Sequence, residues 1–255
     1  MWTRELLKEN GKIAFQRNYW LCVVVSLILG FIGGGAGGIN LNYNFNEMST
    51  TDGTAAIYSF DNLGYLLLMV PLMLISMVLV VAIAFAVSAF LVNIVRIGGC
   101  RFFMENREHK TDVGQVFFAF GNGNYMNCVK TMFWRDLCLV GWTLLFIVPG
   151  IIKGYAYRMI PYIMAENPGI SRQRAFAISE QMMDGHKMEA FVLDLSFIGW
   201  DFLSAVTAGI VGIFYVNPYK NATFTELYTA VKSEAFARGI TDVTELPGVR
   251  IQDER

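Results

Sequence analysis

The chain alternates long apolar runs with short segments that carry most of its charges, a pattern typical of membrane-spanning helices. An uncharged stretch of about 20 residues crosses a hydrocarbon core of roughly 30 Å, because a helix rises about 1.5 Å per residue. The apolar runs predict spans at about residues 20–39, 63–95, 126–148, 151–166, 187–206 and 210–231.

Two of these predicted spans do not have the length of one straight crossing. The run 63–95 is too long, so tilt, protrusion or a kink at Pro71 must absorb the excess. Pro149 and Gly150 are the predicted helix break after the third span, and the segment 151–166 barely spans at roughly 23 Å. The segments on either side of this break form a tight transmembrane hairpin or a re-entrant element, and the hairpin is favoured.

The composition agrees with a membrane protein and excludes other classes. Hydrophobic residues make up 55% of the chain and charged residues 16%, whereas a soluble domain carries about 25% charged residues. A formal net charge of −1 supplies no basic field for nucleic acid. We expect an all-α, polytopic transmembrane helical bundle of about six spans (four or five as the alternative) with cytoplasmic amphipathic helices. Residues 1–238 would form a single integral membrane domain, and 239–255 a polar flexible tail.

The distribution of positive charge predicts the orientation of this bundle. Lys and Arg collect in the cytoplasmic loops of membrane proteins. With six spans and both termini inside, every Lys and Arg except Lys153 and Arg158 lies on the cytoplasmic side or at that interface. A four-span arrangement would leave five basic residues outside, so six spans with cytoplasmic N- and C-termini are favoured.

A cytoplasmic amphipathic helix over residues 171–185 is a candidate docking element. Its serine cap, the Pro-Gly before it and the glycine at its end define the helix. The candidate docking residues are Arg172, Arg174, Met182 and Met183, which would face a membrane-protein partner or anionic lipid. The alternative is that this helix only joins two spans.

Signatures of catalysis and of metal binding are missing from the sequence. It contains no H-E-x-x-H, no G-x-S-x-G, no phosphate-binding loop and no dinucleotide fingerprint. Only two histidines are present, and the four cysteines include no C-x-x-C pair. We expect no catalytic residue, no metal and no cofactor, and therefore no enzyme.

Ionisable residues within apolar runs are the strongest local pointers to function, because each costs a few kcal/mol to insert into a bilayer. Lys153, Arg158, Asp194 and Asp201 form this candidate polar core. The two aspartates are seven positions apart and so share a helix face, ahead of a predicted turn at 207–209. Either a cation pairs with an aspartate across adjacent helices, or these residues line a polar cavity for a substrate, an ion or a lipid headgroup.

The second half of the chain carries several motifs that resemble a known family. They are Leu144 to Tyr157 with Pro149-Gly150-Ile151, Pro161-Tyr162, Asn167-Pro168, Met183-x-Gly185-His186-Lys187, Phe191 to Trp200, and Val216 to Thr223. They resemble the bacterial integral-membrane family of domain of unknown function 975 over nearly the whole chain. A more distant similarity, to Yip-type proteins and to membrane domains attached to glycerophosphodiester phosphodiesterases, supports six helices by analogy. The family supplies no activity to transfer.

These observations predict a non-enzymatic, multi-pass protein of the bacterial cytoplasmic membrane, with a transport-associated role or a role in envelope maintenance or lipid handling. A stand-alone permease for a small solute or peptide is one alternative, and it predicts a water-accessible cavity lined by the intramembrane charges. A membrane-embedded lipid enzyme is the other, and it needs a cluster of acid, base or metal-binding groups. The expected partners are membrane lipid and either a membrane-protein partner or a second copy of the chain, and not nucleic acid.

Overall fold

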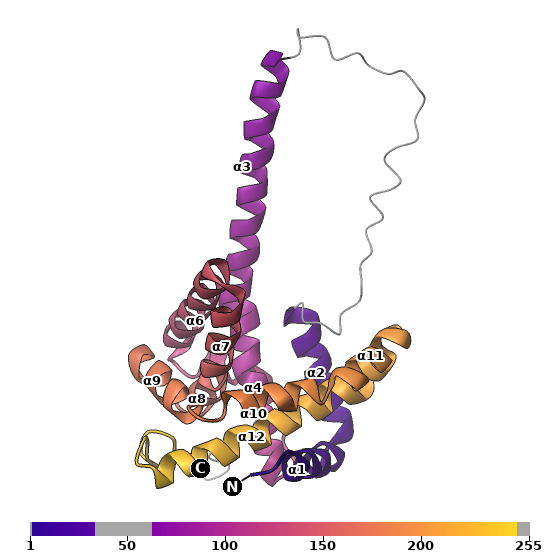
Figure 1. Cartoon of the computed structure of the whole chain (residues 1–255), viewed down its shortest axis with the longest axis vertical. Helices are drawn as coiled ribbons and strands as arrows, with labels where there is room; N and C mark the ends of the chain where they lie inside the picture. The colour runs from indigo at the N-terminus through magenta and orange to yellow at the C-terminus, as the bar shows by residue number, and fades with distance from the viewer. Residues whose placement is uncertain (1, 34–62, 249–255) are drawn as a thin grey trace. The chain divides into compact units, whose positions relative to one another are not determined.

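A computed structural model of the chain is all-helical over the residues that it describes, 2–33 and 63–248, with no strand in those ranges (Figure 1). This confirms the predicted all-α class for the described residues. The elements are α1 (Arg4–Arg17), α2 (Tyr19–Gly33), α3 (Leu63–Val87), η3 (Ser88–Val92), α4 (Asn93–Glu108), η4 (Val113–Phe117), α5 (Phe118–Gly121), α6 (Tyr125–Leu145), α7 (Ile147–Ala156), α8 (Ile160–Glu166), α9 (Arg172–Met182), α10 (Lys187–Leu195), α11 (Ile198–Val206), η5 (Gly212–Val216) and α12 (Asn217–Ala237).

The chain divides into two compact units, and the smaller one is Ile39–Ser88. Its described helix, α3, has 25 residues and contains Pro71. The predicted run 63–95 is therefore not one regular α-helix, because α3 ends at Val87 and the π-helical turn η3 follows. The side chains from Met69 to Val80 are exposed and almost all apolar.

The larger unit consists of Met1–Gly38 and Ala89–Arg255, and α4 lies at its centre. This helix contacts α1, α2, α6, α8 and α12. Its apolar residues Ile94, Ile97 and Phe102 are fully buried. Because helices surround α4 on several sides, its polar side chains also need partners inside the fold, and Arg101 meets this need by pairing with Glu105 one turn later at 3.0 Å.

Among the described helices, none combines the length and the apolar composition that a membrane crossing requires. Arg4–Arg17 and Tyr19–Gly30 meet the requirement only as a pair, which is bent by 104° at its break, and Met69–Val80 is a shorter apolar segment. The first predicted span, 20–39, is described only as far as Gly33. The six predicted spans therefore stay a prediction.

The helices α6 and α7 form a hairpin whose break lies at Phe146, three residues before the predicted one. Phe146 has an extended backbone (φ −155°, ψ 134°) and stands between the two helices. The predicted break at Pro149 and Gly150 is wrong in position, because Pro149 lies in the first turn of α7, where its missing N–H has no intrahelical partner to lose. Gly150 instead permits close packing on α6, since a Cβ there would lie 2.9 Å from the Cα of Thr143.

The helix α9 begins where the sequence predicts and ends at Met182, three residues before the predicted glycine. Ser171 caps it, and its Oγ accepts a hydrogen bond from the backbone N–H of Arg174 at 3.3 Å. The chain turns after α9 through Gly185, whose φ of +84° suits a residue without a side chain.

The predicted span 187–206 is two short helices, α10 and α11, rather than one. They separate at Ser196 and Phe197, where the Ser196 hydroxyl donates to the backbone carbonyl of Leu193 at 2.5 Å. Such a local hydrogen bond competes with the regular helix ladder. The predicted turn at 207–209 is confirmed, because Ala208 and Gly209 both have positive φ.

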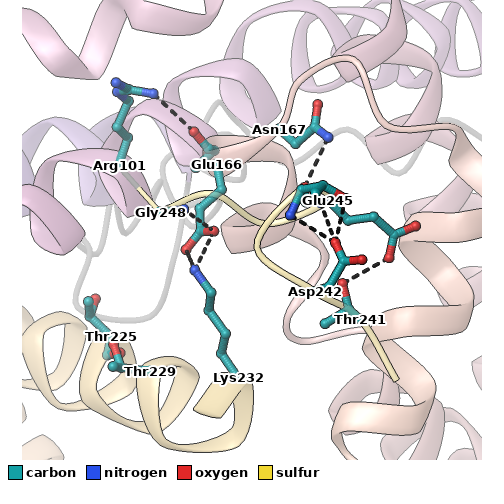
Figure 2. Close-up of polar contacts among 12 residues, drawn as sticks. Arg101, Glu166, Asn167, Thr225, Thr229, Lys232, Thr241, Asp242, Glu245 and Gly248 are labelled. Carbon is teal, nitrogen blue, oxygen red and sulfur yellow. Dashed lines mark hydrogen bonds and ion pairs between the residues drawn. The ribbon is translucent and has the colours of Figure 1, made fainter. Parts of the chain in front are cut away.

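Residues 239–248, part of the predicted flexible tail, contact α9 through Arg174 and the end of α8 through Asn167 and Glu166. Figure 2 shows the contacts with Asn167 and Glu166. The Arg174 guanidinium donates to the Glu245 carboxylate at 2.8 and 2.7 Å. The Asn167 side chain donates to the backbone carbonyl of Glu245 at 3.0 Å, and Leu246 is buried. Residues 239–248 therefore make contacts within the fold, and the flexibility of the tail stays a prediction; residues 249–255 lie outside the described part of the chain.

Candidate functional site

The predicted polar core is centred on Asp194 of α10. Arg158, in the turn between α7 and α8, donates through both terminal nitrogens to the two carboxylate oxygens of Asp194. The Tyr155 hydroxyl donates to the same carboxylate at 2.9 Å. The Arg158 and Asp194 side chains are 26% and 21% exposed, so the pair is half-buried. This is one of the cation–aspartate pairings that the sequence suggests.

Lys220 of α12 belongs to the same cluster, although its charge was assigned to the cytoplasmic C-terminal part. Its Nζ lies 3.6 Å from Asp194 Oδ1 and 3.4 Å from Asp201 Oδ2. Lys220 therefore links the two predicted aspartates across the break between α10 and α11. The signal that could have found it is its position inside the predicted span 210–231, where a cation needs a counter-charge.

Lys153 pairs elsewhere, with Glu180 of α9. The distance from Lys153 Nζ to Glu180 Oε1 is 2.6 Å, and Nζ also lies 5.4 Å from the centre of the Tyr157 ring. The two charged side chains are 33% and 40% exposed, so the pair contributes little to stability. The structure thus brings three of the four predicted polar-core residues together and leaves Lys153 outside.

The predicted docking residues of α9 are engaged within the chain. Met182 and Met183 are 1% and 0% exposed, so they pack in the core and are not available to a partner. This corrects the prediction, because the chain itself covers the apolar face of the amphipathic helix. Arg172 lies over the ring of Trp134, 4.8 Å from its centre, and Arg174 binds Glu245.

A cavity of about 360 Å³ lies next to the Asp194 cluster and shares Arg158 with it. Its walls come from α2, η3, α4, α6, α7, the turn after α7, α8 and α12. Its polar lining consists of Arg96, Cys100, Arg135, Tyr157, Arg158, Tyr162, Asn221 and Thr225, and its larger apolar lining residues are Leu29, Val92, Val95, Phe103, Leu139, Pro161 and Phe224. Three guanidinium groups and several apolar side chains therefore meet in one cavity.

Arg135 of α6 is bound directly by a carboxylate. Its Nε and Nη2 donate to Asp136 Oδ1 at 3.1 and 2.6 Å. The other oxygen of Asp136 accepts a hydrogen bond from the Asn93 side chain at 2.6 Å. Arg135 is 8% exposed and Asp136 24% exposed, so the arginine is buried and its hydrogen-bonded partner is half-buried.

Arg96 of α4 differs from the other two cavity arginines, because no hydrogen bond or ion pair joins it to another group in the described ranges. Burial lowers its pKa, the nearby charge of Arg135 lowers the pKa further, and the carboxylate of Asp136 offsets part of this effect. An arginine keeps its proton at neutral pH even so. Asp136 and Asp194 balance two of the three guanidinium groups, which leaves one positive charge in excess.

Cys100 and His186, a potential nucleophile and a potential proton-transfer group, lie in different places. Burial raises the pKa of the Cys100 thiol to about 12, so this cavity residue is protonated at neutral pH. His186 lies outside the cavity, and its two ring nitrogens are 3.2 Å from Glu189 and 3.1 Å from Glu234. Within the described ranges, no group of three or more His, Cys, Asp and Glu side chains is placed to hold a metal ion.

Comparison with known proteins places the chain in a family. No curated protein and no solved structure matches it significantly. A family with the description "Protein of unknown function (DUF975)" matches residues 4–235, a range that contains both the Asp194 cluster and the cavity. The chain therefore belongs to the DUF975 family, as the motifs in its second half predict.

Proposed function

We propose that the chain is an integral protein of the bacterial cytoplasmic membrane that handles lipid and catalyses no reaction itself. The tip of the α6–α7 hairpin carries this proposal. The side chains of Leu144, Leu145, Phe146, Ile147 and Val148 are all apolar, and each is between 66% and 82% exposed. A soluble monomer rarely leaves such a contiguous apolar surface in water, and a bilayer would accommodate it.

A second exposed apolar surface in the same unit, the tip formed by α11 and the turn after it, also favours a location in a bilayer. Phe202 and Val206 of α11 are 70% and 68% exposed, and Ile210, after the turn, is 61% exposed. These large side chains have no covering partner among the described residues. Contact with hydrocarbon would remove the apolar side chains of both tips from water, which is favourable.

The length of α7 favours a hairpin that enters the membrane and returns without crossing it. Its ten residues rise about 15 Å, half of a hydrocarbon core of about 30 Å. Figure 1 shows α8 and α9 at the end of the hairpin away from its tip. That end carries the Lys153–Glu180 pair, which is suited to the interface between lipid and water. We therefore favour the re-entrant form over the transmembrane hairpin.

The cavity favours lipid binding over catalysis. Its lining contains no Asp, Glu or His, the side chains that most often act as general acids and bases. Its arginines hold their protons at neutral pH, so they bind an anion and do not transfer protons. Cationic and apolar side chains in one cavity are suited to an amphiphilic molecule.

Membrane insertion of the hairpin tests this proposal. Wild-type protein should stay in the membrane pellet after an alkaline wash that removes peripheral proteins. Ile147→Lys places a charge in the tip, which costs about 3 kcal/mol at the bilayer centre and should lower the inserted fraction. Val243→Lys is the matched control, because Val243 is 62% exposed but lies in the C-terminal segment. Release of the wild-type protein by the wash, or equal insertion of both variants, would contradict the proposal.

A further inference from the structure

We propose that the arginine-lined cavity binds the headgroup of an anionic phospholipid through its single phosphodiester, with Arg96 as the principal contact. This inference rests on the proposed lipid-handling function and specifies the ligand of the same cavity. It follows from the charge balance, the hydrogen-bond donors and the apolar walls of the cavity.

The cavity has one positive charge in excess, which one negative charge on a ligand would neutralise. Arg135 and Arg158 each have a carboxylate partner, Asp136 and Asp194. Arg96 is hydrogen-bonded to no carboxylate among the described residues; Asp136 attracts it electrostatically but is held by Arg135, and a cation in a cavity without a contacting counter-ion is costly. A phosphodiester carries one negative charge and so neutralises this excess, whereas a phosphate monoester carries about −1.5 to −2 at neutral pH.

The donors around the cavity match a phosphate. An arginine fork binds phosphate oxygens through two parallel hydrogen bonds, and the guanidinium of Arg96 has no competing partner of this kind. The Asn221 amide and the Thr225 hydroxyl line the same space, and both are already engaged within the fold, to Ser26 and to the Asn221 carbonyl. An added anion would therefore form its principal new hydrogen bonds with Arg96.

The apolar walls indicate that the anion is attached to hydrocarbon. Leu29, Val95, Phe103, Leu139 and Phe224 face the cavity beside the arginines. The volume of about 360 Å³ is near the lower end of the ~300–1,000 Å³ range of small-molecule sites. It accommodates a phosphate with its glycerol and the first part of a chain, so most of the acyl chains would lie outside.

The absence of a carboxylate from the cavity lining selects among phospholipids. A headgroup with an ammonium would bring a positive charge next to Arg96, with no Asp or Glu in the lining to receive it. A headgroup with hydroxyls and no ammonium avoids this repulsion. The chemistry therefore fits phosphatidylglycerol and excludes phosphatidylcholine.

Binding of short-chain lipids to the purified, full-length protein in detergent tests the inference. The probes are dioctanoyl phosphatidylglycerol, dioctanoyl phosphatidylcholine and glycerol phosphate, measured by calorimetric titration. Arg96→Gln should weaken phosphatidylglycerol binding by about ten- to a hundredfold, which is the loss expected for a charge-assisted hydrogen bond. Arg4→Gln, at an exposed arginine of α1, should bind like the wild type.

Each outcome decides a separate point. Equal phosphatidylglycerol binding by the two variants would overturn the role of Arg96. Equal binding of phosphatidylcholine would overturn the charge argument, and equal binding of glycerol phosphate would show that the ligand is a free organic phosphate. A structural role for Arg96 predicts a lower melting temperature for Arg96→Gln without lipid, whereas the inference predicts an equal or higher one. Because Arg96→Gln should remain in membranes after the alkaline wash, failure of binding is distinguishable from failure of membrane insertion.

Discussion

Lys232→Met removes one half of a buried ion pair and should destabilise the fold strongly. The Lys232 Nζ of α12 lies 2.8 and 2.6 Å from the two carboxylate oxygens of Glu166 at the end of α8. The side chains are 13% and 4% exposed, and the backbone N–H of Gly248 donates to the same carboxylate at 3.2 Å (Figure 2). This carboxylate therefore connects α8, α12 and the C-terminal segment.

The magnitude follows from what remains around Glu166 after the substitution. Breaking a buried pair by removing one partner costs about 3–5 kcal/mol, because the remaining charge stays buried without compensation. Here the positive charge of Arg101 lies close enough to Glu166 to interact with it and offsets part of this loss. We therefore expect a loss near the lower end of the range, about 3 kcal/mol, which lowers the melting temperature by roughly 6–12 °C for a chain of this length.

Thermal unfolding of the detergent-purified protein measures this loss. Lys130→Met is the matched control, because Lys130 is exposed on α6 and should change the melting temperature little. The double variant Glu166→Gln with Lys232→Met removes both charges and should regain most of the stability. A Lys232→Met protein as stable as the control, or a double variant no better than the single one, would refute the reasoning.

Three further predictions concern the hairpin, the ion-pair cluster and the C-terminal segment. Gly150→Val should lower the melting temperature, because its side chain would collide with the backbone of α6 and cost about 1–3 kcal/mol; unchanged stability would contradict the close approach. Asp194→Asn should destabilise the fold more than Arg158→Gln does, because it leaves Arg158 without its carboxylate and Lys220 with Asp201 alone, whereas Asp194 keeps Lys220 after the reverse change; thermal unfolding of both variants decides the order. The hydrogen bond from Arg174 lowers the pKa of Glu245 below its ordinary value of 4.5. This contact therefore stabilises the segment above that value and loses its effect as pH falls through the lowered pKa. The protection of residues 239–248 against hydrogen exchange, measured relative to the intrinsic exchange rate at each pH, should therefore fall as the pH drops below 4.5 and should not change between pH 6 and 8.

Local sequence signals predicted several elements well because they depend on neighbouring residues only. The helix predicted after residue 126 is α6, which begins at Tyr125. The serine cap of α9 and the turn at 207–209 are also where the sequence places them. Each depends on a cap, a glycine or a continuous apolar run, and these act within a few positions of the chain.

The sequence-based predictions misplaced one helix break and missed another. The break at Phe146 was misplaced because the proline beyond it is tolerated in the first turn of a helix, so proline marks the neighbourhood of the break and not its position. The break between α10 and α11 lies within an apolar run, and only the side-chain hydrogen bond of Ser196 marks it.

The site depends on contacts between residues far apart in the chain, which periodicity does not encode. Glu166 and Lys232 are 66 positions apart, and Arg158 and Asp194 are 36 apart. Arg96 adjoins the end of the predicted span 63–95, where an arginine is typical of a membrane interface. Only the folded arrangement shows that it faces a cavity with two other arginines whose charges are already balanced.

Labelling of the hairpin tip tests the central claim, its location within the hydrocarbon core, most directly. Leu144→Cys, where the native side chain is 82% exposed, and Ser233→Cys, at an exposed position of α12, would be placed in a protein whose four native cysteines are replaced by alanine or serine. A membrane-impermeant maleimide would then be added to intact cells and to inside-out membrane vesicles. The account predicts that position 144 is protected from both sides until detergent is added, while position 233 reacts in the vesicles. Reaction of position 144 in either preparation at the rate of position 233 would contradict it.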